Sequence, residues 1–329
     1  MKKVLLIIFT IIITSISIAA QTSDEVATNV DEETAQTPAD RPLKEQDRLR
    51  RRWWVSMSLA SVFDTNITHD EQQIGSFGLV PSFGFHFRDN VERPSFEADY
   101  EVALHRYNHT DEFDRLSQNL TAVYRKQLAK RVYSKTTTEI SLKGSSEDQE
   151  VNNNYIFEEQ LQYRFAFNTR VAGFAAYRLK RYPLIDRDSN SIDSYVGAKV
   201  EQRLRGDRRV EFTYRYDHNR AWDPRNNYIR RTYSVEFQTP LSIVRSDSVS
   251  AEFRYSPRDY QNRTTRVNGI RVPRHDDRWV FDVTYTRLLR PDLSMEIFYQ
   301  YEKRNSNDID KFFTSNQFGL SFTFDKWDW

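Results

Sequence analysis

The feature that most constrains this chain is a strict alternation of apolar and polar side chains, which begins at Trp53 and continues toward the C-terminus. In residues 77–87 every second position is Phe, Leu or Pro, and in residues 293–301 every second position is Leu, Met, Ile or Tyr. A period of two is typical of a β-strand with one apolar and one polar face. The sequence therefore predicts an all-β protein.

About 14 segments show this alternation, and most contain ten or more residues. Strands of soluble proteins average about 5–6 residues, whereas a tilted strand needs about 9–11 residues to cross a bilayer. The segment lengths therefore favour membrane strands. The predicted segments are 53–63, 75–87, 95–106, 115–127, 131–143, 154–167, 171–182, 192–204, 209–217, 228–239, 248–256, 278–288, 293–303 and 314–324.

The connections between these segments tend to alternate in length, which is the rule for outer-membrane barrels. Short turns are expected at Asn168–Arg170, Arg205–Arg208 and Leu289–Asp292. Longer polar loops are expected at Asp64–Ile74, Gly144–Asn153, Pro183–Ser191, His218–Asn227, Pro257–Asp277 and Arg304–Phe313. We therefore predict a transmembrane antiparallel up-and-down β-barrel of about 14 strands with both termini in the periplasm. A soluble all-β protein is the alternative, although it would not separate its loops in this way.

Composition agrees with a barrel. The chain is 38% hydrophobic and 14% aromatic, with a mean hydropathy of −0.75, which excludes a helical membrane protein. The 48 basic and 47 acidic side chains nearly cancel, so no nucleic-acid partner is expected. Because the chain contains no Cys, disulfides, thiolate catalysis and Cys-ligated zinc are excluded.

Three parts are expected along the chain. Residues 1–20 combine a basic start, an apolar run and small residues, as a cleaved signal peptide does, with a retained anchor as the alternative. Residues 21–52 form a disordered periplasmic linker, whose basic end precedes Trp53 and suits either a membrane interface or a solvated tail. Residues 53–329 form the barrel, which we expect the barrel-assembly machinery to insert into a bacterial outer membrane.

The end of the last strand breaks the alternation. Phe318, Phe322 and Phe324 keep one phase, whereas Trp327 and Trp329 are out of phase with them. Either a β-bulge near Asp325–Lys326 restores the phase, or the two tryptophans belong to an aromatic girdle at the membrane interface.

The polar face of the strands is unusually charged, and it must face the lumen because an outward Arg or Lys costs about 2–4 kcal/mol at the bilayer midplane. The charges in such a lumen either select solutes or form cross-strand ion pairs that stiffen the barrel and partly block the lumen. Simple hairpin folding places Glu158 opposite Lys180 and Arg203 opposite Glu211. The candidate selectivity residues are Glu97, Asp99, Glu101, Arg125, Lys135, Glu158, Arg164, Arg178, Lys180, Lys199, Arg203, Glu211, Arg215, Glu252 and Arg254. Further inward charges are expected at Glu139, Glu201, Glu236, Asp282 and Glu296.

Two loops carry candidate contact residues. Pro257–Asp277 is the longest expected loop and contains five arginines, including Arg263 and Arg266, so it either narrows the mouth or covers it. Trp222 lies in a polar loop, where it either contacts a sugar or packs the loop onto the barrel.

No motif for a cofactor or a catalytic site is present. There is no glycine-rich phosphate loop and no nucleophile elbow, and His105 and His109 lack a third ligand at a suitable spacing for a metal. We therefore expect neither a cofactor nor a metal, and a protein that is not an enzyme. An outer-membrane hydrolase would instead need a compact Ser/His/acid cluster at one mouth of the barrel.

The segment Ser61-Val62-Phe63-Asp64-Thr65-Asn66-Ile67 resembles the end of an early strand in porin-like barrels, some of which are linked to exopolysaccharide systems. It also resembles the start of the barrel half of surface-assembly modulators, but no helical-repeat domain precedes the barrel here. Residues 21–52 also contain no segment that fits a globular plug.

Together these features predict a channel for small polar solutes, or for export of a surface glycan, through a charged lumen. The partners expected are outer-membrane lipid and such a solute or glycan. A closed structural or adhesion barrel that acts through its external loops is the second hypothesis, and a hydrolase at the rim is the third.

Overall fold

The computed structural model describes residues 53–67, 74–89, 95–108, 114–145, 153–166, 168–182, 190–241, 247–308 and 311–327. The chain divides into residues 1–41 and residues 42–329, and every described residue belongs to the second unit. The predicted signal peptide and linker therefore lie outside the described residues and stay predictions. Among the described residues, no helix is long and apolar enough to cross a membrane.

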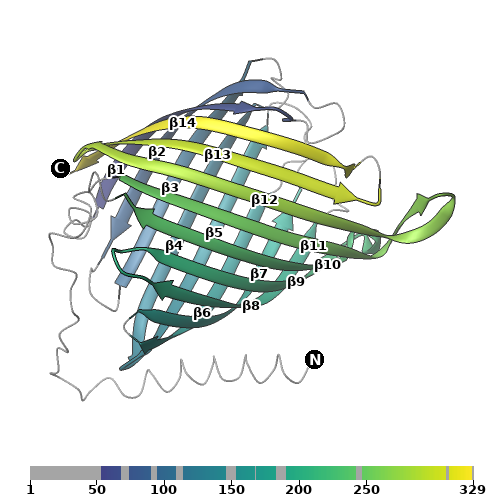
Figure 1. Ribbon diagram of the computed structural model, residues 1–329, viewed down its shortest axis with the longest axis horizontal. Helices are drawn as coiled ribbons and strands as arrows, with labels where there is room; N and C mark the ends of the chain where they lie inside the picture. The colour runs from purple at the N-terminus through teal and green to yellow at the C-terminus, as the bar shows by residue number, and fades with distance from the viewer. Residues whose placement is uncertain are drawn as a thin grey trace. The chain divides into compact units, whose positions relative to one another are not determined.

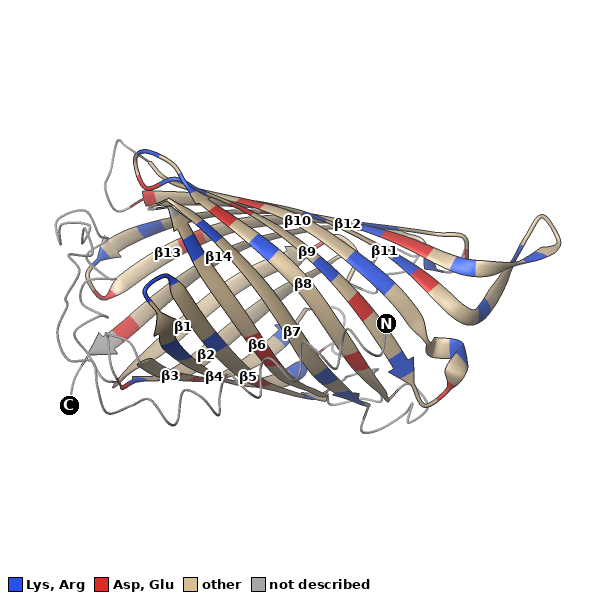
Figure 2. Ribbon diagram, turned by 90° about the horizontal axis from the view of Figure 1, so that it is seen from below, with Lys and Arg blue, Asp and Glu red and all other residues tan. Residues whose placement is uncertain are grey.

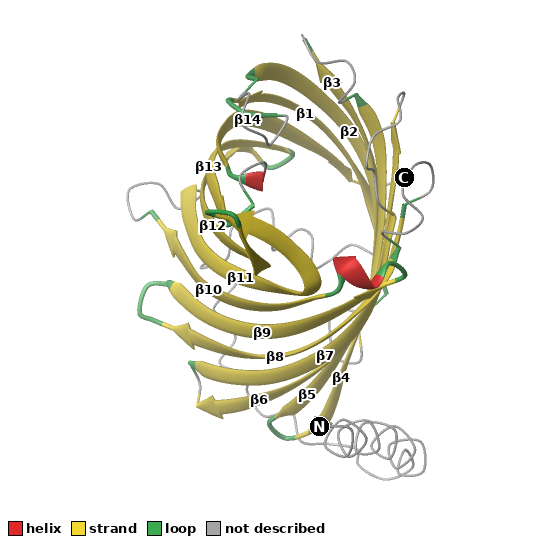
Figure 3. Ribbon diagram, turned by 90° about the vertical axis from the view of Figure 1, so that its right-hand side faces the viewer, coloured by secondary structure: helices red, strands yellow, loops and turns green. Residues whose placement is uncertain are grey.

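Fourteen antiparallel strands form one closed barrel in which each strand pairs with its neighbours in sequence and β14 pairs with β1 (Figures 1 and 3). The strands are β1 (Trp53–Asp64), β2 (Ser76–Arg88), β3 (Ser95–Tyr107), β4 (Arg115–Ala129), β5 (Val132–Ser145), β6 (Asn153–Ala166), β7 (Thr169–Arg181), β8 (Ser191–Arg203), β9 (Arg209–Ala221), β10 (Tyr228–Pro240), β11 (Asp247–Val267), β12 (Ile270–Arg290), β13 (Leu293–Ser306) and β14 (Phe313–Trp327). The predicted fold class is confirmed, and so is the predicted strand number.

The apolar half of each alternating pattern faces outward. Phe83, Phe157 and Phe212 are each 43–52% exposed, and they belong to a belt of large exposed apolar side chains that surrounds the barrel. Exposed apolar side chains are unfavourable in water but suit the hydrocarbon core of a bilayer. Because strand side chains alternate, the polar half of the pattern faces the lumen.

The barrel has two rims, one at each end of its strands. The termini rim is the one where β1 begins and β14 ends, on the left of Figure 1. The far rim is the opposite one, from which β11 and β12 project beyond the other strands (Figure 1). The turns predicted at residues 168–170, 205–208 and 289–292 lie at the termini rim, and their positions are confirmed. Which rim faces the periplasm stays a prediction.

The predicted loop Pro257–Asp277 is wrong, because these residues extend β11 and β12 into a two-stranded hairpin. Asn268 and Gly269 form its turn with φ of +51° and +79°, the left-handed geometry of a tight hairpin. Arg263 and Arg266 therefore lie in a strand rather than in a loop. A register shift between Asp259 and Thr264 marks the base of the projecting hairpin.

Both predicted cross-strand ion pairs are also wrong. Glu158 lies opposite Ala176, and Lys180 lies opposite Asn154. Arg203 lies opposite Arg209, and Glu211 lies opposite Glu201. The turns cause the difference, because an irregularity near Arg164 and Ala166 in one hairpin and a turn from Leu204 to Arg208 in the other move the register.

The last strand contains no bulge at Asp325–Lys326. Its pairing with β1 runs without interruption from Gln317 to Trp327. Asp325 faces inward and is completely buried, whereas the neighbouring Phe324 faces outward. The side chain of Trp327 and all of Trp329 lie outside the described residues, so the predicted aromatic girdle stays a prediction.

Candidate functional site in the barrel lumen

A cluster of cations lines the inner face of β7–β11 toward the far rim. Figure 2 colours the Lys and Arg positions blue along the strands. We call this cluster the arginine-rich region. It contains five cations and two carboxylates, namely Arg178, Lys180, Arg215, Arg230 and Arg258 with Asp193 and Asp217. The region therefore carries three more positive than negative charges.

Two buried carboxylates, Asp193 and Asp217, form ion pairs with four of the cations. Asp193 contacts Arg178 and accepts from Lys180 Nζ at 2.9 Å, and Asp217 accepts from Arg215 and from Arg230 at 3.1 Å each. Both aspartates are completely buried, whereas the exposed fraction of the four cation side chains is 12–28%. The surface that the region presents to the lumen is therefore basic.

Arg258 differs from the other cations. No carboxylate among the residues described lies within ion-pairing distance of it. Its guanidinium lies 4.5 Å from the centre of the Tyr228 ring, and it donates to the Tyr260 hydroxyl at 3.2 Å. Arg258 is directly opposite Arg230 on the neighbouring strand, and like charges in that position repel. On the other neighbouring strand, β12, Arg258 lies opposite Asp276, but this carboxylate accepts two hydrogen bonds from Arg274.

A second group of charges crosses five strands in register, nearer the termini rim. In this acidic row each carboxylate lies directly opposite the next on β8–β12. Its members are Glu201, Glu211, Glu236, Glu252 and Asp282. On β11, Glu252 and Arg258 are six residues apart, or about 20 Å at the usual rise of a strand.

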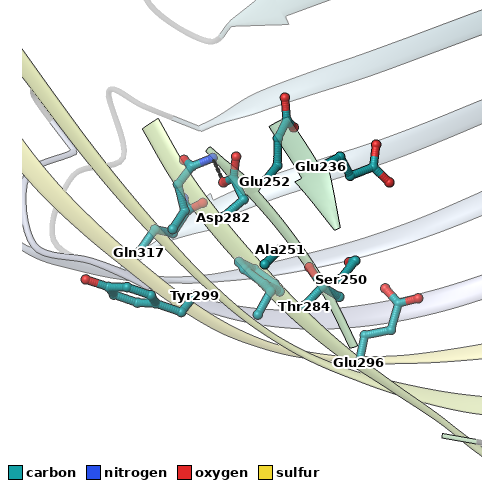
Figure 4. A pocket seen from close by; sticks show the side chains of 11 residues that line it. Glu236, Ser250, Ala251, Glu252, Asp282, Thr284, Glu296, Tyr299 and Gln317 are labelled. Atoms are coloured by element: carbon teal, nitrogen blue, oxygen red, sulfur yellow. Dashed lines mark hydrogen bonds between the residues drawn. The ribbon is translucent and has the colours of Figure 1, made fainter. Parts of the chain in front are cut away.

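The acidic row borders a cavity of about 560 Å³ (Figure 4). Glu236, Glu252, Asp282 and Glu296 contribute four carboxylates to its wall. Asp282 accepts a hydrogen bond from Gln300 Nε2 at 2.6 Å, drawn as a dashed line in Figure 4. The described residues contain no group of three or more acidic or His side chains arranged to hold a metal ion.

Cations on neighbouring positions pair with most of the acidic row. Lys199 contacts Glu211 at 2.8 Å, Arg209 contacts Glu236 at 2.6 Å and Arg254 contacts Glu252 at 2.7 Å. Glu201 lies 3.3 Å from Arg203 and 3.7 Å from Arg170. Five cations thus accompany five carboxylates, so the row is locally neutral, unlike the arginine-rich region.

A third arrangement lies on the inner face of β1–β3, close to the termini rim. Ser56 Oγ is 2.9 Å from His86 Nε2, and His86 Nδ1 is 2.7 Å from Asp99 Oδ1. The indole ring of Trp54 stacks on the imidazole with 4.8 Å between ring centres. This is a Ser–His–Asp chain of hydrogen bonds.

The sequence-predicted candidates all face the lumen, but they do not form one cluster. Arg178, Lys180 and Arg215 belong to the arginine-rich region. Five others belong to the acidic row or pair with it, namely Lys199, Arg203, Glu211, Glu252 and Arg254. The remaining seven, Glu97, Asp99, Glu101, Arg125, Lys135, Glu158 and Arg164, lie on β3–β6. Among them, Glu97 pairs with Arg125 at 2.7 Å and Glu158 accepts from the Tyr195 hydroxyl at 3.1 Å. Whether any of these residues selects solutes stays a prediction.

The loop candidates lie around the turn between β9 and β10. Trp222 is 52% exposed, and the Arg181 guanidinium lies 5.0 Å from its ring centre. Asp223 caps the short 3₁₀ helix Pro224–Asn226, and its hydrogen bonds with Arg225 hold the pKa of this carboxyl below its usual value. Arg263 reaches this helix through Asn226 at 3.4 Å, whereas Arg266 is exposed on the hairpin.

Sequence reasoning missed Asp193, Asp217 and Arg230, although all three lie within strands that it predicted. Their inward parity was the available signal. It also missed Arg258, which it placed in a loop, and the meeting of Ser56 with His86.

No protein-family model and no curated protein matches the chain. Solved barrels of bacterial outer membranes resemble it weakly. OmpT, an outer membrane protein of Vibrio cholerae, is 10% identical with a TM-score of 0.49, covering 83% of this chain and 97% of its own. OprD of Pseudomonas aeruginosa is 7% identical with a TM-score of 0.45, covering 83% and 95%. The KdgM porin, solved in complex with disordered oligogalacturonate, is 8% identical with a TM-score of 0.37, covering 83% and 99%.

The closed barrel, its apolar outer belt and its charged inner face define the class of protein. A closed barrel satisfies every backbone hydrogen bond without water, and the outer belt replaces protein–water contacts with lipid. The chain is a closed antiparallel β-barrel of the bacterial outer membrane.

Proposed function

We propose that this barrel is a channel for small polar solutes, or for a surface glycan, and that it favours anionic solutes. The charge excess of the arginine-rich region carries the proposal. A charged ring or patch in a narrow aqueous path concentrates ions of opposite sign and repels ions of the same sign.

The acidic row does not cancel this preference, because four of its five carboxylates pair with adjacent cations, and the five cations balance the five negative charges of the row. An anionic solute would meet an unbalanced basic surface toward the far rim and a locally neutral one toward the termini rim. Transport of this kind needs no covalent chemistry, and the expectation that the protein is not an enzyme stays a prediction.

Single-channel recording tests the proposal. The refolded full chain in planar bilayers should give steady ionic steps, and a salt gradient should give a reversal potential on the anion-selective side. Arg215→Ala should lower the anion-to-cation permeability ratio roughly twofold, because one charge about 8 Å away in water is worth about 0.5 kcal/mol. Arg231→Ala, which removes an outward charge beside Asp259, serves as the control. A correctly folded barrel without conductance would contradict the proposal.

The projecting hairpin of β11 and β12 favours a second candidate, a closed barrel that acts through its exposed segments. Residues 260–274 contain four Arg and no Asp or Glu, and Arg266 lies directly opposite Arg271. Replacing residues 264–273 with a two-residue turn should abolish attachment to an anionic surface in this case. The same deletion should leave conductance intact if the barrel is a channel.

Contacts with lipid along the outer belt, and with the barrel-assembly machinery during insertion, are also part of this proposal. Heat-modified electrophoretic mobility after refolding into vesicles, with and without that machinery, is the measurement that tests them.

A further inference from the structure

The Ser56–His86–Asp99 chain on the inner face of β1–β3 has the geometry of a hydrolytic site. A carboxylate only accepts hydrogen bonds, so the 2.7 Å contact with Asp99 places the imidazole proton on Nδ1. The lone pair of Nε2 then faces the Ser56 hydroxyl at 2.9 Å. A serine that donates to a histidine oriented in this way is an activated nucleophile.

Gly84 has no side chain, and this leaves room for the contact between Ser56 and His86. Ser56 lies directly opposite Gly84, and His86 lies directly opposite Asp99. A Cβ at position 84 would lie 2.4 Å from Ser56 Oγ and 2.7 Å from His86 Nε2, far inside van der Waals contact. Any other residue at Gly84 would therefore push the serine and the histidine apart.

A second Ser–His pair in the barrel can be compared with Ser56 and His86. His105 and Ser117 form a second Ser–His pair on the inner face, with 3.2 Å between Nε2 and Oγ. Among the residues described, no acidic side chain contacts His105, and Arg115 and Lys143 are its charged neighbours. Of the two pairs, the one on β1 and β2 alone has a carboxylate that orients its imidazole.

We propose that Ser56 and His86 are catalytic residues of an esterase site in the lumen and that Asp99 is their positioning residue. Ser56 Oγ attacks the ester carbonyl carbon while its proton passes to His86 Nε2. The carbon–oxygen bond to the alcohol breaks, His86 returns the proton to the leaving oxygen, and an acyl-Ser56 ester remains. Water then attacks the acyl carbon and gives one proton to His86. The bond between the acyl carbon and Ser56 Oγ breaks, His86 returns the proton to Oγ, and the carboxylic acid leaves.

The surroundings indicate the class of substrate. Ser58 and Ser82 hydrogen-bond to each other at 2.7 Å on the same face, one inward position farther from the termini rim. Apart from the Trp54 ring, which is covered by the imidazole, these neighbours are polar, so a long acyl chain would gain little apolar contact there. The expected substrate is a short-chain ester on a polar carrier. This activity departs from the expectation of a barrel that is not an enzyme, and it does not require the channel to conduct.

Hydrolysis of p-nitrophenyl acetate by the refolded full chain in detergent micelles tests the proposal. Ser56→Ala should lower the rate about 100-fold or more, in line with the contribution of a positioned acid–base pair. Ser117→Ala, the matched control, should leave the rate unchanged. A fluorophosphonate probe should label the wild-type peptide that contains Ser56. A folded wild-type barrel that neither hydrolyses the ester nor is labelled at Ser56 would overturn the proposal.

Gly84→Ala is the sharper variant, because it removes none of the three polar side chains. It should lower hydrolysis about tenfold or more while circular dichroism and heat-modified mobility match those of the wild type. Asp99→Asn should also lower the rate, because an amide can donate to Nδ1 and so present the wrong tautomer to Ser56. An unchanged rate in both folded variants would show that the arrangement is structural.

Discussion

The arginine-rich region and the acidic row each involve five cations, but the first contains two carboxylates and the second contains five. In the first, two completely buried aspartates are each shared by several cations, and three positive charges are left over. In the second, most carboxylates pair with one cation each, and the pairs are partly exposed. The side chains of Glu252 and Arg254, for example, are 28% and 37% exposed.

This difference has energetic consequences. A buried carboxylate that is shared by several cations is costly to remove, because the cations then repel one another with little water to screen them. A half-exposed pair is screened by water and contributes little. The first arrangement suits a fixed basic surface, and the second suits a neutral wall that strengthens the barrel without attracting ions.

The largest expected effect is on stability. Asp217→Asn should lower the free energy of unfolding by about 3–5 kcal/mol, because Arg178, Arg215 and Arg230 lose their shared carboxylate. Glu252→Gln, in the acidic row, should lower it by about 1 kcal/mol or less. Urea unfolding in detergent micelles, followed by tryptophan fluorescence, measures both. Equal losses would show that the two regions hold their charges in the same way.

The next effect is on ion selectivity. Arg258→Gln removes a cation that has no carboxylate partner, so the reversal potential should move toward cations by the equivalent of roughly a twofold change in permeability ratio. The double variant Glu252→Gln/Arg254→Gln removes a complete ion pair and should leave the reversal potential unchanged. A shift of the same size in the double variant would contradict the neutrality of the acidic row.

The alternation of side chains was enough to predict the barrel, because lipid outside and water inside impose a period of two on every strand. It also indicated the inward face of Arg178, Lys180 and Arg215. The projecting hairpin escaped prediction because residues 260–266 are polar on both faces, so no apolar period marks the strand there.

The alternation of side chains does not indicate the pairing register between neighbouring strands. The turns near Ala166 and Gly206 move Lys180 and Arg203 two or more residues from their predicted partners. Which side chains meet across strands depends on the register of each hairpin. The contact of Ser56 with His86 depends in the same way on the pairing of β1 with β2. The composition of the lumen was therefore predictable, whereas its ion pairs and its serine site were not.

The smallest expected effect concerns the support of Arg258. Tyr260→Phe removes the hydroxyl that accepts from Arg258 Nη1, and Tyr255→Phe removes an outward hydroxyl of the same strand that donates to Asp277. Each should cost about 1 kcal/mol of stability in urea unfolding. Only Tyr260→Phe should also move the reversal potential, and by less than Arg258→Gln, because the guanidinium keeps its charge but loses one contact that directs it. If Tyr260→Phe leaves the reversal potential unchanged, the Tyr228 ring alone positions Arg258, and the basic surface depends on stacking rather than on hydrogen bonding.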